Sequence, residues 1–503
     1  MAVYPRRTPD LSVARTAIRS ASMSRQSLPT PERTTLSRHL RVLSRQIPLF
    51  SQADSADQAT PTSSGSSLGM SQRSGCSVQS SLSGTKKASQ VVRSLVVHTA
   101  KPLFPQKTGV MQRPGLPLPA GEALKAYRSE LSAYEVKEIA GYEVVHYVGK
   151  GKAKARDGKY ENREGDYLVR VGDQIAFRYE ILGILGKGTY GVVARCKDHK
   201  TGEEVAIKVI KSRPLYHQQG LSEISVLQVL RDQGHGTIVT LKGSLLFRKH
   251  LCLVFELLAG SLSCLLKGNK LHSVPMIVMK EYTLQLVNAL KCLKDAKVVH
   301  CDLKPDNILV DNEGKLRLID FGCACFEKTA SPCYAQSRHY RAPEVILETG
   351  LNCSVDMWSL GCILAEMAKG KVIFPGDNEK QQLALMMELL GKPAKGLVAR
   401  SAKKAQFFDS SGAPKQMHSS KGCPIFPGSL SLSLYLSGCG KSFSDFVSRC
   451  LDWNPQSRLT PDQALDHPWL TTTDPPVPKS PPNEISVSQS LQALTHRRMS
   501  IQI

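Results

Sequence analysis

Four polar residues that suit phosphoryl transfer lie in one short stretch, residues 298–322, VVHCDLKPDNILVDNEGKLRLIDFG. Lys304 follows Asp302 by two positions, Asn307 follows it by five, and Asp320 lies further along. Phosphoryl transfer requires a group that orients the attacking hydroxyl and oxygen ligands for magnesium. Asp302 suits the first role. Asn307 and Asp320 suit the second, because hard cations prefer oxygen donors.

A hairpin is needed to bring the two aspartates together. Ile308–Val310 and Leu316–Ile319 are predicted to be short strands, and Asp311–Gly314 the turn between them, because Asn and Gly tolerate positive φ. The second strand then returns Asp320 to Asp302. A single Asp in a turn is usually a solvated cap, but the complete set at these spacings favours a catalytic site.

A glycine-rich segment, Gly186–Val193, follows a predicted strand at Tyr179–Leu185. A lone GxGxxG is a weak signal, and a dinucleotide-binding turn is its usual alternative. In that turn a helix begins at the third glycine, whereas Val192–Cys196 here continues as a strand. The glycines are therefore predicted to close a hairpin whose amides can approach phosphates, because no Cβ intervenes.

Lys208 lies within an apolar strand, Val205–Ile210, so its charge is expected to have a partner. Glu223, 15 residues further on in the predicted helix Leu221–Leu230, is the candidate. The two residues are predicted to form an ion pair.

Composition divides the 503 residues, whose net charge is +23. Residues 1–120 carry 16 Lys and Arg against 4 Asp and Glu, with 31 Ser and Thr and only three aromatic residues, so they are predicted to be a disordered tail. A basic tail could bind nucleic acid, but dispersed charge without interleaved aromatic residues favours a plain solvated tail. Residues 471–503, rich in Pro and Ser, are also predicted to be disordered.

The 14 cysteines are scattered and form no CxxC pair, which indicates reduced thiols and an intracellular setting. Cys323 and Cys325 lack two further ligands for a metal site. No apolar run approaches membrane-spanning length, so no membrane association is expected.

Residues 179–470 contain, in this order, the glycine-rich loop, Lys208, Glu223, Asp302, Asn307, Asp320 and Ala342-Pro343-Glu344. These motifs resemble those of eukaryotic protein kinases. The resemblance implies an α+β bilobal fold, with a small β-rich N-lobe (179–258) and a larger helical C-lobe (259–470) that holds an insert at about 392–440.

Three further segments, His300–Asp302, Ser337–Glu344 and Asp173–Glu180, resemble the dual-specificity tyrosine-regulated kinases (DYRK family, CMGC group). Residues 121–178 resemble the N-terminal accessory region of the class II members. That family phosphorylates Ser and Thr in protein substrates and autophosphorylates one activation-loop tyrosine, which implies ATP and Mg²⁺ as cofactors.

The resemblance assigns roles within the site. Asp302 is the implied catalytic base, Lys304 neutralises the transferred phosphoryl group, and Asn307 and Asp320 bind Mg²⁺. Glu344 is expected to pair with Arg458, and Asp356 to order the catalytic loop. The expected ATP-binding residues are Leu185, Gly186, Lys187, Gly188, Thr189, Tyr190, Gly191, Val192, Val193, Lys208, Phe255, Glu256, Leu257 and Leu258.

Tyr334 is the candidate autophosphorylation site. The family loop reads Tyr-x-Tyr, whereas here Pro332 replaces the first tyrosine. Arg338 and Arg341 are the expected ligands of the phosphate, as bidentate donors. His339 stands where the family usually has a bulky aromatic residue.

The main alternative is an inactive kinase that acts as a scaffold. That hypothesis predicts the loss of Lys208, Asp302 or Asp320, and all three are present. We expect a monomer that acts on proteins with Ser or Thr sites, without nucleic-acid binding. The expected location is the cytoplasm, with the nucleus as an additional one.

Overall fold

The computed structural model describes residues 115–149, 159–234, 236–268, 274–311, 313–329, 335–418 and 422–472. These residues all belong to one structural unit, residues 73–503. The predictions of disorder for 1–120 and 471–503 fall almost wholly outside the described residues. In the described part of the chain, no helix combines the length and apolar character that crossing a membrane requires.

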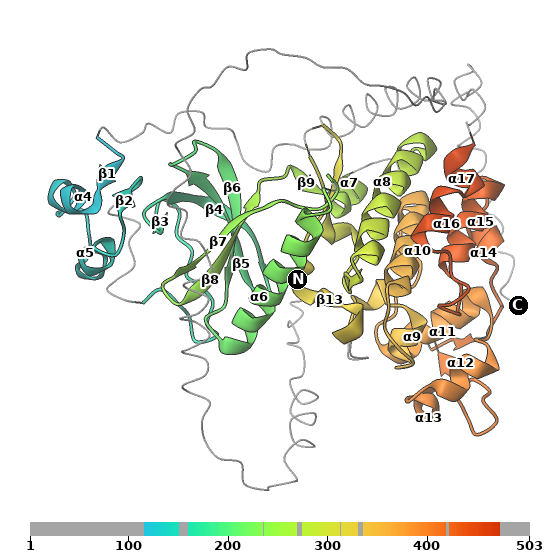
Figure 1. Ribbon diagram of the computed structural model, residues 1–503. Helices are drawn as coiled ribbons and strands as arrows, with labels where there is room; N and C mark the ends of the chain where they lie inside the picture. The colour runs from blue at the N-terminus through green and yellow to red at the C-terminus, as the bar shows by residue number, and fades with distance from the viewer. Residues whose placement is uncertain are drawn as a thin grey trace, which may run out of the picture. The chain divides into compact units, whose positions relative to one another are not determined.

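The N-lobe is built on a six-stranded antiparallel sheet in the order β3-β4-β5-β6-β8-β7 (Figure 1). Gly188 pairs with Gly191 at the end of the β4–β5 hairpin, which confirms a hairpin rather than a dinucleotide-binding turn. The bounds are β3 (Gln174–Ile175), β4 (Tyr179–Gly188), β5 (Gly191–Asp198), β6 (Glu204–Ile210), β7 (Leu241–Phe247) and β8 (His250–Glu256).

Helix α6 (Pro214–Arg231) runs beside this sheet (Figure 1). Proline at its first position costs no hydrogen bond, because the first amides of a helix have no intrahelical partner. Val226, Leu227 and Leu230 are buried on one side, and Glu223, also buried, points from the same helix into the protein. The helix therefore carries Glu223 toward β6.

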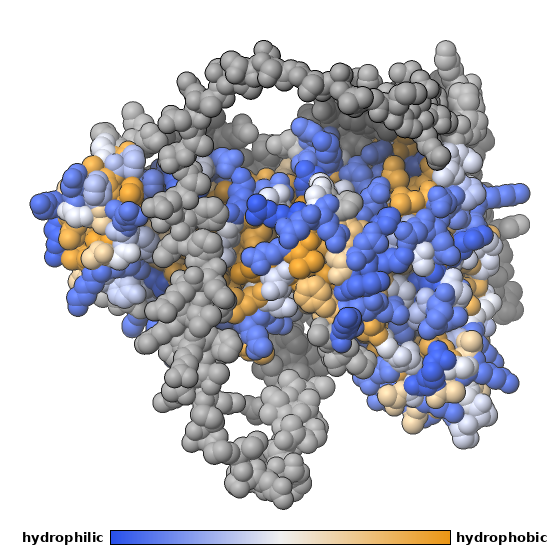
Figure 2. Space-filling view, viewed as in Figure 1, coloured by the Kyte–Doolittle hydropathy of each residue, from blue (hydrophilic) through white to orange (hydrophobic). Residues whose placement is uncertain are grey.

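The C-lobe is organised around α10 (Ser354–Lys369), which is buried nearly all round, as its apolar sequence predicts. The visible face of the surrounding helices is mostly hydrophilic in Figure 2, because their apolar residues turn inward. The other helices are α7 (Leu262–Gly268), α8 (Met276–Asp295), α9 (Pro343–Ile346), α11 (Glu379–Leu390), α15 (Lys441–Cys450), α16 (Pro461–Leu465) and α17 (Pro468–Thr471).

The segment at 392–440 folds into the C-lobe. Leu397, Phe407 and Phe408 are buried in the same apolar core as α10. Its elements are α12 (Lys395–Arg400), α13 (Lys404–Phe407), β14 (Met417–His418), β15 (Pro424–Ile425) and α14 (Leu432–Tyr435).

The accessory block is the region that includes residues 121–178. Apolar residues at helical spacing (Leu124, Tyr127, Leu131 and Tyr134) predict a single helix over residues 122–140, and the structure departs from this prediction. The block forms two helices, α4 (Ala120–Ala126) and α5 (Ala133–Ile139). Ser132 caps α5 by accepting a hydrogen bond from the amide of Glu135, whose carboxylate accepts from the Ser132 amide in return. This capping box starts a new helix. The apolar segment 142–148, YEVVHYV, predicts a strand, but the observed strand is confined to β2 (Val144–Val145), which pairs with β1 (Leu118–Pro119).

Arg248, in the turn between β7 and β8, anchors the accessory block to the N-lobe. Its guanidinium is buried and lies 2.8 Å from the carboxylate of Glu138 in α5. It also stacks over the ring of Tyr160 at 3.6 Å and donates to the Tyr167 hydroxyl at 3.4 Å. The accessory block is thus held on the N-lobe by a buried charge with a carboxylate and aromatic partners.

Candidate active site

The catalytic loop lies between short strands, and the predicted hairpin is present. β11 (Ile308–Val310) pairs with β12 (Leu316–Leu318) and with β9 (Gly260–Ser261). β10 (Val298–Val299) pairs with β13 (Cys325–Phe326). These pairings enclose the loop that carries Asp302 and return the chain to Asp320.

Asp302 is held by four hydrogen bonds from three residues. Its Oδ1 accepts from the amide and the hydroxyl of Ser337, at 3.1 and 2.7 Å. Its Oδ2 accepts from Lys304 Nζ at 2.6 Å and from Asn307 Nδ2 at 3.1 Å. This fixed carboxylate can orient a substrate hydroxyl, and Lys304 lies beside it, as the sequence predicts.

Asp356 supports the loop from α10. Its carboxylate accepts from the amides of His300 at 2.8 Å and Cys301 at 3.2 Å, and its side chain is buried. A buried carboxylate requires hydrogen-bond donors, and here the two backbone amides provide them. These bonds hold the backbone at His300 and Cys301 in place. The expected ordering role of Asp356 is confirmed.

Ser337 is a site residue that the sequence analysis did not assign. Its hydroxyl donates to Asp302 and accepts from Lys304 Nζ at 3.1 Å. Ser337 lies 35 residues after Asp302, so no local spacing announces the contact. It connects the segment after the activation loop to the catalytic carboxylate.

The predicted ion pair of Lys208 and Glu223 is confirmed and has a third member. Lys208 Nζ lies 2.9 and 2.8 Å from the two carboxylate oxygens of Glu223 and 2.7 Å from Oδ1 of Asp320. Burial alone would lower the pKa of Lys208, but the charges of Glu223 and Asp320 raise it above its ordinary value. The lysine is therefore charged, and it joins the two lobes at one point.

Asp320 adopts a left-handed conformation, with φ of 60° and ψ of 71°. This region is costly for a residue with a Cβ, so the surroundings must impose it. Phe321 is buried and packs edge-to-face on His300, with ring centroids 4.9 Å apart. Burial alone would raise the pKa of Asp320, but Lys208 lowers it overall, which keeps the carboxylate charged.

Two oxygen atoms near Asp302, one from Asn307 and one from Asp320, suit the binding of a divalent cation. Asn307 uses its amide nitrogen to donate to Asp302, so its amide oxygen is left as a possible metal ligand. Asp320 uses Oδ1 for Lys208, and Oδ2 has no partner among the described residues. An amide oxygen and a carboxylate are hard ligands of the kind such cations prefer.

The glycine-rich loop closes the site from the N-lobe. An added Cβ at Gly191, whose φ is +153°, would collide with the carbonyl oxygen of Val209, so this position requires glycine. The Tyr190 hydroxyl lies 3.1 Å from Cys323 Sγ, just after Asp320-Phe321-Gly322. Of the other expected ATP-binding residues, Leu185 lies on β4, Val192 and Val193 on β5, and Phe255 and Glu256 end β8 before Leu257 and Leu258.

Tyr334 and Pro332 lie outside the described residues, so the phosphate site stays a prediction. Arg341 is 1% exposed; its Nη1 lies 2.9 Å from Glu379 Oε1, and its Nη2 donates to the Gln336 carbonyl at 2.7 Å. Arg338 donates to the carbonyl of Asp377 at 2.6 Å. Both guanidiniums thus make structural contacts that the sequence did not predict.

The expected bridge of Glu344 and Arg458 is confirmed. Nη1 and Nη2 of Arg458 lie 2.5 and 2.8 Å from the two oxygens of Glu344, and both side chains are buried. Arg458 also donates to the carbonyls of Asp452 and Ser354. This network fixes the segment that follows Ser337 to the C-lobe.

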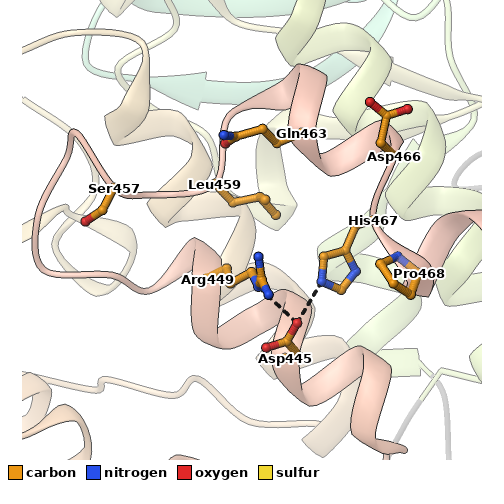
Figure 3. A pocket seen from close by; sticks show the side chains of 8 residues that line it. All are labelled: Asp445, Arg449, Ser457, Leu459, Gln463, Asp466, His467 and Pro468. Atoms are coloured by element: carbon orange, nitrogen blue, oxygen red, sulfur yellow. Dashed lines mark hydrogen bonds and ion pairs between the residues drawn. The ribbon is translucent and has the colours of Figure 1, made fainter.

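A hollow of about 320 Å³ lies in the C-lobe between α15 and the segment of α16 and α17 (Figure 3). Asp445 lies 3.0 Å from Arg449 and 2.9 Å from His467, so these polar groups contact one another. The hollow contains none of the predicted site residues. Its lining is Asp445, Arg449, Ser457, Leu459, Gln463, Asp466, His467 and Pro468.

Lys208→Arg should lower kcat at least about tenfold without unfolding the protein, because a planar guanidinium cannot place its charge between Glu223 and Asp320 as the compact ammonium does. The measurement is the steady-state rate on a Ser/Thr peptide, with thermal unfolding as the check on folding. Lys291→Arg, the same change at a half-buried position of α8 outside the predicted site, is the control. Wild-type kcat in Lys208→Arg would disprove the role of this ion pair.

Comparisons with known proteins agree with this geometry. Residues 179–470 match the protein kinase domain family. The chain is 38% identical over 429 residues to human dual specificity tyrosine-phosphorylation-regulated kinase 4, covering 83% of this chain and 82% of the relative. It is 38% identical over 400 residues to mouse dual specificity tyrosine-phosphorylation-regulated kinase 3, covering 73% and 68%.

A fission-yeast relative, the DYRK-family kinase pom1 of Schizosaccharomyces pombe, is 42% identical over 355 residues, which cover 68% of this chain and 33% of the relative. The similarity to the three relatives extends over most of this chain. The chain therefore belongs to the dual-specificity tyrosine-phosphorylation-regulated kinases, the DYRK family of protein kinases.

Proposed function

We propose that this dual-specificity protein kinase uses ATP with Mg²⁺ to phosphorylate Ser and Thr in proteins, and that it activates itself through Tyr334. The arrangement of Lys208 between Glu223 and Asp320 carries the proposal, because it assembles residues from both lobes around one site. A scaffold without activity would not need this assembly.

In the proposed mechanism, Asp302 accepts the hydrogen bond of the substrate hydroxyl and orients it toward the γ-phosphoryl group. Lys304, 2.6 Å from Asp302, offsets negative charge on the transferred group. Lys208 holds the phosphates of ATP. Asn307 and Asp320 would hold Mg²⁺, which neutralises charge on the phosphates when bound.

Tyr334 is the proposed switch. It precedes Arg338 by four residues and Arg341 by seven, so a bend in the loop would bring its phosphate to both guanidiniums. Charge-assisted hydrogen bonds of about 1.5–3 kcal/mol each would offset the entropy lost on ordering the loop. Arg341 would bind the phosphate while exchanging or sharing its contact with Glu379.

Full-length protein made in bacteria, without any other kinase of this kind, should carry phosphate on Tyr334. Tyr334→Phe should then lower the rate on a Ser/Thr peptide at least about tenfold, because the loop loses its charged contacts. Mass spectrometry of the purified protein and a peptide assay are the measurements. Tyr142→Phe, in the accessory block, is the matched control. A fully active preparation with unmodified Tyr334 would contradict the proposal.

We further propose that the kinase is a monomer of the cytoplasm that also enters the nucleus, and that it binds neither membranes nor nucleic acid. The dispersed basic charge of residues 1–120 supports the last point. Sedimentation of the full chain and salt-dependent RNA binding, with and without residues 1–120, test the oligomeric state and the tail. A dimer, or RNA binding lost with the tail, would overturn the corresponding part.

A further inference from the structure

Asp166 lies in a structured turn of the accessory block. Oδ1 of Asn162 accepts from the amides of Glu164 at 3.0 Å and Asp166 at 2.9 Å, and Nδ2 of Asn162 donates to Asp166 Oδ2 at 3.1 Å. Asp166 itself is only 3% exposed. Its carboxylate is therefore held in one orientation by its own turn.

This carboxylate faces two lysines from the N-lobe. Its Oδ2 lies 3.0 Å from Nζ of Lys187, which stands between Gly186 and Gly188 in the glycine-rich loop. Its Oδ1 lies 3.4 Å from Nζ of Lys211, at the end of β6, and has no hydrogen bond among the described residues. Burial alone would raise the pKa of Asp166, but hydrogen bonds from Lys187 and Asn162 and the charge of Lys211 lower it overall.

The same turn also contacts the segment that leads into α6. The amide of Ser212 donates to the carbonyl of Gly165 at 3.0 Å. Nη2 of Arg213 donates to the carbonyl of Arg163 at 2.7 Å. Arg213 is the residue before α6, the helix that carries Glu223. One turn thus contacts both the glycine-rich loop and the segment that leads into α6.

Beyond the β4–β5 pairing, the glycine-rich loop is held at Tyr190, whose hydroxyl lies 3.1 Å from Cys323 Sγ and whose ring packs edge-on against Tyr216. Its two outer glycines have open space around them. A Cβ added at Gly186 or Gly188 would meet no atom within 4 Å. A loop with open space around two of its glycines relies on a small number of tethers to keep its amides in position. The contact between Lys187 and Asp166 is such a tether.

We propose that Asp166 is a positioning residue for the nucleotide. It holds Lys187 and thereby keeps the glycine-rich loop in the position where its backbone amides can contact the phosphates. The accessory block then contributes to ATP affinity in the mature enzyme. This inference rests on the proposed use of ATP and goes beyond it, because Asp166 itself does not contact the reacting groups.

The test uses the full chain. Asp166→Asn keeps the size of the side chain but removes its charge, and it should weaken ADP binding about threefold by calorimetry, as expected for a partly exposed ion pair. KM for ATP should rise by the same factor, while KM for the peptide and kcat stay within about twofold. Glu164→Gln removes a charge from the same turn without reaching Lys187 and should change neither constant.

A double-mutant cycle separates this role from a structural one. Lys187→Met should weaken ADP binding as much as Asp166→Asn does. The double variant should bind ADP no more weakly than either single variant. The loss should shrink at high salt, because Lys187 is partly exposed and the pair is screened. Additive losses would overturn the proposal. So would unchanged ADP affinity in Lys187→Met, which tests the tether even where Asp166→Asn fails to fold.

The wild-type protein could fail to phosphorylate peptides while the ADP affinities of the variants still show the predicted coupling of Asp166 and Lys187. That result would count against the proposed function and not against the positioning role of Asp166. The calorimetric readout needs no phosphoryl transfer, so the two failures are distinguishable.

Discussion

Asp302→Asn should lower kcat on a Ser/Thr peptide at least about 100-fold, while ADP affinity stays close to wild type. The reason is geometric and chemical. Asn keeps the size, and its amide oxygen can still accept both bonds from Ser337, while its NH2 group gives up those from Lys304 and Asn307. The bonds from Ser337 should keep the loop in place. Its neutral amide, however, is a poor acceptor for the proton of the attacking hydroxyl.

Steady-state kinetics and calorimetry on the full chain make this measurement. Asp295→Asn, the same change at an exposed position of α8, is the matched control and should keep wild-type kcat. Activity within about threefold of wild type in Asp302→Asn would refute Asp302 as the group that orients the hydroxyl. Loss of ADP binding together with activity would show instead that Asp302 acts by holding the fold.

Arg458→Met should lower the free energy of unfolding of the C-lobe by about 3–5 kcal/mol, because it leaves the buried carboxylate of Glu344 without its partner. The arginine also provides hydrogen bonds to Asp452 and Ser354 and lies over the ring of Trp358 at 5.2 Å. The buried carboxylate of Glu344 and two half-buried carbonyl groups would therefore lose their donor at once.

Urea unfolding followed by tryptophan fluorescence suits this prediction, because all three tryptophans lie in the C-lobe. Arg449→Met removes an arginine whose partner Asp445 is exposed, and it should change stability by less than about 0.5 kcal/mol. Equal midpoints for Arg458→Met and wild type would show that the buried bridge contributes little. Arg458→Met with Glu344→Leu should recover part of the loss, because no charge is then left unpaired.

Local patterns in the sequence predicted much of the site. The strand that continues after Gly191 distinguished a hairpin from a dinucleotide-binding turn, and the β4–β5 pairing confirms it. An apolar strand around Lys208 required a partner for the charge, and Glu223 is that partner. Such predictions succeed because each depends on a short segment whose periodicity fixes which side chains share a face.

Contacts between distant segments were missed. Ser337, Asp166 and Glu379 act through partners that no spacing relates to them, and only the folded chain brings them together. The single helix expected over 122–140 failed for another reason. Apolar residues keep helical spacing through the break, yet the pattern Ser132-x-x-Glu135 is a readable capping box that marks a new helix start.

The most direct test of the central claim is a phosphoryl-transfer assay of the purified wild-type protein with labelled ATP, Mg²⁺ and an array of Ser/Thr peptides, read beside Asp302→Asn. We predict transfer to Ser and Thr by the wild-type protein, and transfer at least about 100-fold slower by the variant. A wild-type protein that binds ADP but labels no peptide, or a variant that labels peptides equally fast, would contradict the account of this site.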